Sequence, residues 1–108
     1  MGAIGLTASV AATTVAQRNV TALEPGEYAV EVRGAPCFIL QGGADVAATT
    51  TNAERQRDGV FWSFTVVNHY DPTIARAFLS IRTESGTATV RVTRQDSSTA
   101  TTALPAWA

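Results

Sequence analysis

The chain has 108 residues and a net charge of −1, with 45% hydrophobic and 16% charged residues. This length is typical of a single domain, and the near-neutral charge gives no basis for electrostatic attraction to nucleic acid. The charged fraction is below the average of about 25%, which is typical of a surface that lies against another protein. No run of about 20 apolar residues occurs, so the sequence contains no transmembrane helix.

The first 22 residues are rich in Ala, Thr and Val and contain few charges. Their alanine content would suit a helix, but the β-branched residues in "TTVA" and "NVT" favour extended chain. We therefore predict an extended N-terminal arm over residues 1–22, long enough to reach a neighbouring subunit. The triplet "NVT" also places Asn19 in a glycosylation sequon.

Alternating strand patterns and turn residues begin at the "EPG" turn and continue to about residue 94. In "EYAVEVR", Tyr28, Val30 and Val32 point to one face. The run "CFIL" is apolar throughout, which predicts a strand buried on both faces or a strand whose second face meets another subunit. The segment "VAATTT" predicts a weak strand, and "NAERQRDG" predicts a polar excursion between strands.

The second half of this zone contains the strongest strand pattern, "VFWSFTVVN", in which Trp62, Phe64 and Val66 share one face. The next segment, "IARAFLSIR", predicts a strand, with a short helix over "PTIARAFLSIRT" as the alternative. "ESG" then predicts a hairpin turn into the strand "TATVRVTR". Turn signals at intervals of about 8 to 12 residues predict an all-β fold, a small antiparallel β-sandwich or jelly-roll-like barrel over residues 23–95. The residues expected to fill its core are Tyr28, Val30, Val32, Phe38, Phe64, Leu79, Val90 and Val92.

Few residues in the sequence carry the chemistry of a catalytic or metal site. Cys37, the one cysteine, lies in the apolar run "CFIL", where a free cysteine is usually a small buried core residue. His69 could pair with Cys37, or with Asp71 in "HYDP", although Asp71 is also an ordinary turn residue. Cys37 and His69 alone cannot supply the ligands of a zinc site. We therefore expect no enzyme activity, no cofactor and no metal.

The C-terminal tail, residues 96–108, is polar and rich in Thr until Leu104 and Trp107. Pro105 stiffens the segment between these two large apolar residues. A tryptophan near a chain end can bury a large, rigid side chain on a partner at modest entropic cost. We therefore predict that Leu104 and Trp107 dock onto a neighbouring subunit or a protein lattice, with a disordered tail as the alternative.

The run "EPGEYAVEVRGAPCFILQGGADVAATTT", followed by a polar loop, a strong strand and "SGTATVRVTR", resembles small β-rich virion proteins of tailed bacteriophages. The resemblance covers residues 26–94 and implies a structural virion protein that decorates or cements the capsid. It implies assembly with copies of itself, with a trimer favoured, and contact with the major capsid protein or another virion protein at the capsid surface. Neither nucleic acid nor a membrane is an expected partner.

Two other functions are compatible with the sequence. One is a small head or tail adaptor of the virion. The other is a carbohydrate- or receptor-binding β-module, in which Phe61, Trp62 and Phe64 would form a stacking platform.

Overall fold

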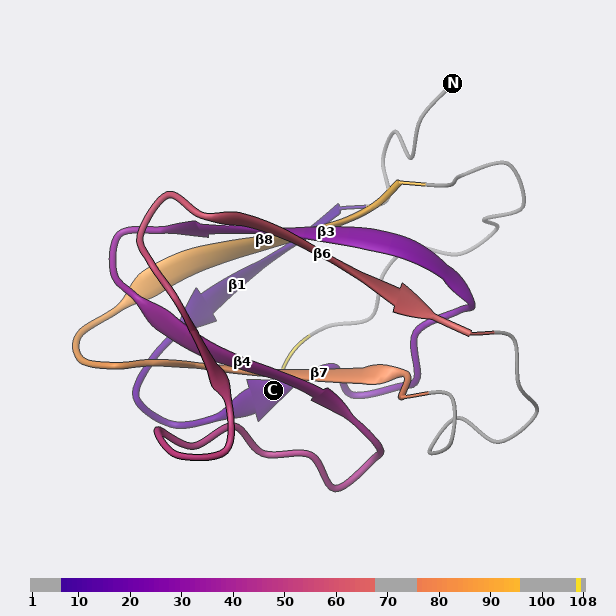
Figure 1. Cartoon of the computed structure of the whole chain (residues 1–108), viewed down its shortest axis with the longest axis horizontal. Coiled ribbons are helices and arrows are strands. Elements are labelled where there is room, and N and C mark those ends of the chain that lie inside the picture. Colours follow the sequence, from indigo (N-terminus) through magenta and orange to yellow (C-terminus); the bar gives the residue numbers. More distant parts are fainter. Residues whose placement is uncertain (1–6, 68–75, 96–106, 108) are drawn as a thin grey trace.

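The computed structural model describes residues 7–67, 76–95 and 107, which contain eight β-strands in two antiparallel sheets. The first sheet has the strand order β1-β8-β3-β6, and the second has the order β2-β7-β4-β5. The sheets face each other as the two layers of a sandwich (Figure 1), which confirms the predicted fold. The strands are β1 (Thr7–Ala12), β2 (Gln17–Arg18), β3 (Gly26–Arg33), β4 (Cys37–Gly42), β5 (Glu54–Gln56), β6 (Phe61–Val66), β7 (Phe78–Thr83) and β8 (Ala88–Arg94).

Strand alternation decides which side chains enter the space between the sheets. In β3, Tyr28, Val30 and Val32 point inward and are fully buried. From the opposite sheet, β7 contributes Leu79 and Ile81, which are also fully buried. Removing apolar surface from water stabilises the fold by about 25 cal/mol per Å², so this layer holds the two sheets together. The expected core residues Tyr28, Val30, Val32, Phe38, Phe64, Leu79, Val90 and Val92 are all buried.

Two residues of the loop after β4, Val46 and Ala48, pack against the outer face of β4 and β7. The Ala48 N–H donates a hydrogen bond to the Ser80 Oγ at 2.8 Å, and both residues are buried. Val46 lies so close to β4 that a Cβ at Gly42 would be 2.9 Å from the Val46 Cγ2. Within this one chain, Cys37, Phe38 and Ile39 of the apolar run in β4 are buried, and Leu40 is half-buried.

The N-terminal segment differs from the expectation. We expected residues 1–22 to form an extended arm, but residues 7–22 contribute β1 to the first sheet and β2 to the second. β1 pairs with β8 along its whole length and places Val10 and Ala12 in the core. Pairing satisfies the backbone hydrogen-bonding groups of this apolar segment, which an arm in solvent would leave to water. Residues 1–6 lie outside the described residues, as do residues 96–106 and 108 of the predicted tail.

The segment "VAATTT" was predicted to be a weak strand, and this prediction is wrong. The Thr49 N–H donates to Asn52 Oδ1 at 2.7 Å, and the Asn52 N–H donates to Thr49 Oγ1 at 3.1 Å. These local bonds compete with a sheet ladder and fold the segment into a turn. A short strand, β5, forms instead within the polar excursion.

The segment that could have been a helix is a strand where the structure describes it. Phe78–Thr83 forms β7, which pairs with β2 on one side and β4 on the other. Residues 72–75 of the helix alternative lie outside the described residues.

Candidate interaction surface

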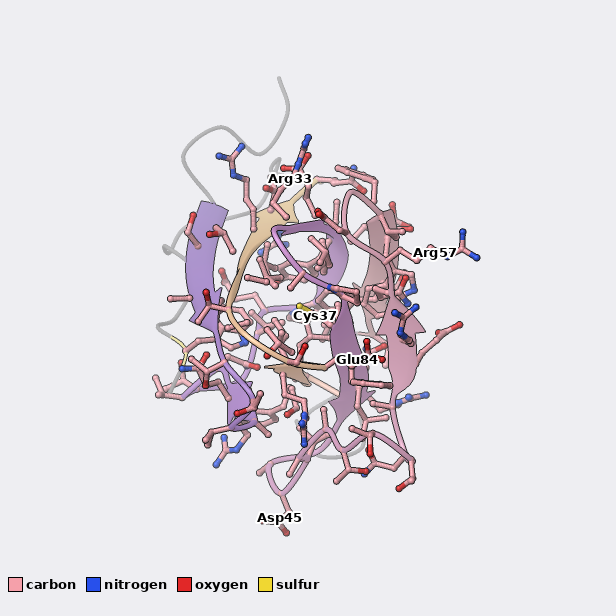
Figure 2. The ribbon with its side chains drawn as sticks, turned by 90° about the vertical axis from the view of Figure 1, so that its left-hand side faces the viewer. Arg33, Cys37, Asp45, Arg57 and Glu84 are labelled. Atoms are coloured by element: carbon pink, nitrogen blue, oxygen red, sulfur yellow. The ribbon has the colours of Figure 1, made fainter. Side chains whose placement is uncertain are left out.

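The thiol of Cys37 lies inside the sandwich (Figure 2). Its side chain is fully buried, and its Sγ is 3.6 Å from the Ala35 carbonyl oxygen. Burial, with a smaller contribution from the Asp58 charge, raises the pKa of the thiol to about 11. Cys37 is therefore a neutral thiol at neutral pH and a poor nucleophile, in agreement with its expected place in the core.

The other residues considered for catalysis, His69 and Asp71, lie outside the described residues. Within residues 7–67, 76–95 and 107, no three His, Cys, Asp or Glu side chains gather into a group that could hold a metal ion. The described residues therefore provide neither a catalytic pair nor a metal centre from which to argue a reaction.

Trp107 lies on its own domain, whereas the sequence predicts that it docks onto a neighbour. Its indole N–H donates to the Leu79 carbonyl oxygen at 3.1 Å, and its backbone forms an isolated antiparallel bridge with Asn19. The ring is half-buried against the core. Leu104, the second residue of the predicted docking pair, lies outside the described residues. In this structure Trp107 covers the part of β7 that lies next to Asn19.

Asn19 is a fully buried polar residue that extends the pairing between β2 and β7. Its Oδ1 accepts a hydrogen bond from the Leu79 N–H at 2.8 Å. Its Nδ2 donates to the carbonyl oxygens of Ala77 at 3.0 Å and Thr21 at 2.7 Å. The side-chain amide thus replaces a stretch of backbone ladder, and in the folded chain the sequon nitrogen is inaccessible to a glycan.

The three aromatic side chains of β6 do not form one stacking platform. Alternation along the strand places Phe61 on the outer face, where it is 66% exposed, and Trp62 and Phe64 on the inner face. The Phe64 ring stacks on Tyr28 at a centroid distance of 5.2 Å and on Trp62 at 5.5 Å. The inward aromatics therefore belong to the core, and Phe61 is left alone on the surface.

β6 lies at the end of its sheet and carries exposed apolar side chains. β6 pairs with β3 and has no strand on its other side among the described residues. Phe61 is 66% exposed, and Val67, directly after the strand, is 54% exposed. Natural proteins usually protect such edges with charge, proline or very short strands, because an open edge pairs readily with another chain. We call residues 61–67 the β6 edge.

The short strand β5 precedes the β6 edge in the chain and carries charged side chains. Glu54 and Arg57 are exposed, and Figure 2 shows the Arg57 side chain pointing away from the domain. Arg55 forms a two-bond ion pair with Glu84, at 2.9 and 3.2 Å. Hydrogen bonding from Arg55 lowers the pKa of the Glu84 carboxyl group below its ordinary value. The β5 edge is thus short and charged, in contrast to the β6 edge.

No protein-family model, curated protein or solved structure matches this chain. Within the described ranges, no helix has the length and apolar character needed to cross a membrane.

Sequence reasoning found the alternation in β6 but not its position in the sheet. Which strand lies at an edge depends on strand order, and local periodicity carries no information on that order. The sequence does contain one indication of an exposed apolar surface. Phe61 and Val67 share a face of the strand with the polar residues Ser63 and Thr65, and large apolar side chains are unusual on a face that polar residues mark as solvent-facing.

Proposed function

We propose that this chain is a non-catalytic structural protein that associates with copies of itself through its β-sandwich. The observation that carries the proposal is the β6 edge, where Phe61 and Val67 are exposed and no strand among the described residues pairs with the outer side of β6. Exposed apolar residues on an open edge favour strand addition by another chain.

The setting that the sequence resemblance implies is a bacteriophage virion, in which the protein would decorate or cement the capsid. A small sandwich that associates with itself is suited to this role, because decoration requires repeated contacts between identical copies and an underlying protein lattice. The partner in that lattice would be the major capsid protein or another virion protein.

The described chemistry supports a binding role over catalysis. The thiol of Cys37 is buried and its pKa is raised to about 11, so it is held in the unreactive form. Phe61 lies on the opposite face of β6 from Trp62 and Phe64. The three rings therefore do not form the shared stacking surface that would favour carbohydrate binding.

The virion role is tested by measuring the composition of particles. Purified particles of the virus that encodes this chain would be analysed by quantitative mass spectrometry, with the major capsid protein as the internal standard. We expect a fixed, high ratio of this chain to the capsid protein that survives repeated sedimentation. Absence of the chain from washed particles would contradict the proposed role.

A further inference from the structure

The direction of the backbone groups in β6 follows from its pairing with β3. The Val32 N–H donates to the Val60 carbonyl oxygen at 3.1 Å, and the Gly59 N–H donates to the Val32 carbonyl oxygen at 2.7 Å. Continuing this alternation along the register, Trp62 and Phe64 exchange hydrogen bonds with β3. The N–H and C=O groups of Phe61, Ser63 and Thr65 must therefore point toward the free edge.

The C-terminal half of this edge is already occupied. The Gln41 Nε2 donates to the Thr65 carbonyl oxygen at 2.9 Å and to the Arg76 carbonyl oxygen at 2.9 Å. In return, the Arg76 guanidinium donates to the Gln41 carbonyl oxygen at 3.0 Å. In the part of the chain that the structure describes, no such bond reaches the edge-facing groups of Phe61 and Ser63. Among the described residues, the N-terminal half of β6 is therefore the open part of this edge.

We propose that this open half pairs with the same half of a second copy, antiparallel and about a two-fold axis at Trp62. This inference rests on the proposed self-association and names its contact. In this register Phe61 of each copy lies opposite Ser63 of the other. The contact therefore contains two Phe61–Ser63 pairs, and each pair can exchange two backbone hydrogen bonds. The first sheets of the two copies then join into one continuous sheet.

The aromatic side chains favour this register. The two Trp62 residues form the central pair without hydrogen bonds, where Cα atoms approach to about 4.5 Å. Trp62 is only half-buried in the single chain and packs against the core on its inner side. On the outer face the two Phe61 side chains are diagonal neighbours, a separation of about 7 to 8 Å that aromatic rings can bridge. Both residues therefore lose exposed apolar surface in the same contact.

Charge complementarity also favours a second copy as the partner. β5 and β6 end their sheets on the same side of the sandwich and are joined by residues 57–60. A two-fold axis at Trp62 therefore brings the β5 edges of both copies to one interface. The exposed Glu54 of each copy can then face the exposed Arg57 of the other, and the charges have opposite sign.

The other edges of the two sheets are less suited to this contact. β2 has two residues and β5 has three, and β5 carries Glu54 and Arg55. β1 is longer, and its Ser9 and Ala11 are exposed, but it offers no large apolar side chain on the surface. β1 therefore provides a matched control edge in the same sheet.

Sedimentation equilibrium of the full chain and two pairs of variants tests the proposal. Ser63→Pro removes an edge-facing N–H from β6, and Ser9→Pro makes the same change at the β1 edge, where proline is also tolerated. Phe61→Lys keeps the strand and places like charges across the axis, and Ala11→Lys is its control on β1. Circular dichroism and urea unfolding of each variant confirm that the sandwich remains folded.

We expect the full chain to form a dimer at about 0.1 mM, and both β6 variants to dimerise about tenfold more weakly or not at all. Ser9→Pro and Ala11→Lys should dimerise like the full chain. If folded β6 variants and β1 variants associate equally, edge pairing is wrong while self-association stands. A full chain that remains monomeric contradicts both edge pairing and self-association, and the composition of particles then decides the virion role separately.

Discussion

Replacing Asn19 by alanine removes a buried side chain that takes the place of strand pairing. Asn19 is fully buried, and its side chain makes three hydrogen bonds, at 2.7, 2.8 and 3.0 Å. The Ala77 carbonyl oxygen keeps a second partner, the Leu23 N–H at 3.0 Å. The Leu79 N–H loses its acceptor and is left buried. The perturbation therefore creates one unsatisfied backbone donor and removes two further bonds.

The expected cost follows from these groups. A hydrogen bond contributes about 1 kcal/mol net, and an unsatisfied buried group costs about 1 to 3 kcal/mol. We expect Asn19→Ala to lower the free energy of unfolding by about 3 kcal/mol. With a urea dependence of about 1 to 2 kcal/mol per molar for a small domain, the unfolding midpoint falls by about 2 M.

Asn52→Ala is the matched control for this experiment. The Asn52 side chain also accepts one hydrogen bond, from the Thr49 N–H at 2.7 Å, and donates another, to the Ala47 carbonyl oxygen at 3.1 Å. It is exposed, so water can replace its bonds, and we expect a loss of about 1 kcal/mol or less. Equal midpoint shifts for the two variants would refute the argument that burial makes the Asn19 bonds costly to remove.

Three further predictions concern the core, the tail and the thiol. Val90→Ala should lower the free energy of unfolding by about 1 to 3 kcal/mol in urea titrations. Val20→Ala, at a side chain that is 51% exposed, should change it by about 0.5 kcal/mol or less. Similar losses for the two variants would contradict the strand register. Trp107→Phe removes the donor to Leu79 and should cost about 1 kcal/mol with no change in sedimentation; weaker association at unchanged stability would instead support docking of the tail onto a neighbour. The pKa of Cys37, about 11 in the folded chain, lies above its ordinary value of 9.0, so its contribution to stability is complete below pH 9 and is lost as the pH rises toward 11. Cys37→Ala should therefore flatten the decline of unfolding free energy between pH 9 and 11, and unchanged slopes would show that the thiol does not cause it.

Strands with strong alternation could be predicted from the sequence alone. In β3 and β8 the inward residues, such as Val30 and Val90, are large and β-branched and alternate with polar residues. One face of each strand is buried, so the pattern determines the orientation of every side chain. β1 has the same orientation, but its inward residues, Val10 and Ala12, are small and lie among other small residues. Its pairing partner, β8, is some 80 residues away in the chain, and no local pattern indicates that contact.

The candidate surface could be predicted only in part. Alternation placed Phe61 and Trp62 on opposite faces, and the structure agrees. That β6 lies at an edge, and that Gln41 covers half of this edge, depends on contacts between distant segments. The tail residue Trp107 illustrates the same limit, because the backbone oxygen that accepts its indole hydrogen bond belongs to Leu79.

Hydrogen exchange at single amides tests most directly whether the β6 edge joins two copies. The Ser63 N–H points to the open edge, and the Ser9 N–H points to the corresponding edge of β1. Exchange rates of both amides would be measured by NMR over protein concentrations below and above the onset of association. We predict that exchange of the Ser63 amide slows by about tenfold or more as copies associate, because a carbonyl oxygen of the second copy accepts its hydrogen bond, while exchange of the Ser9 amide stays constant. If the chain associates and the Ser63 amide exchanges as fast as in the monomer, the β6 edge is not the contact.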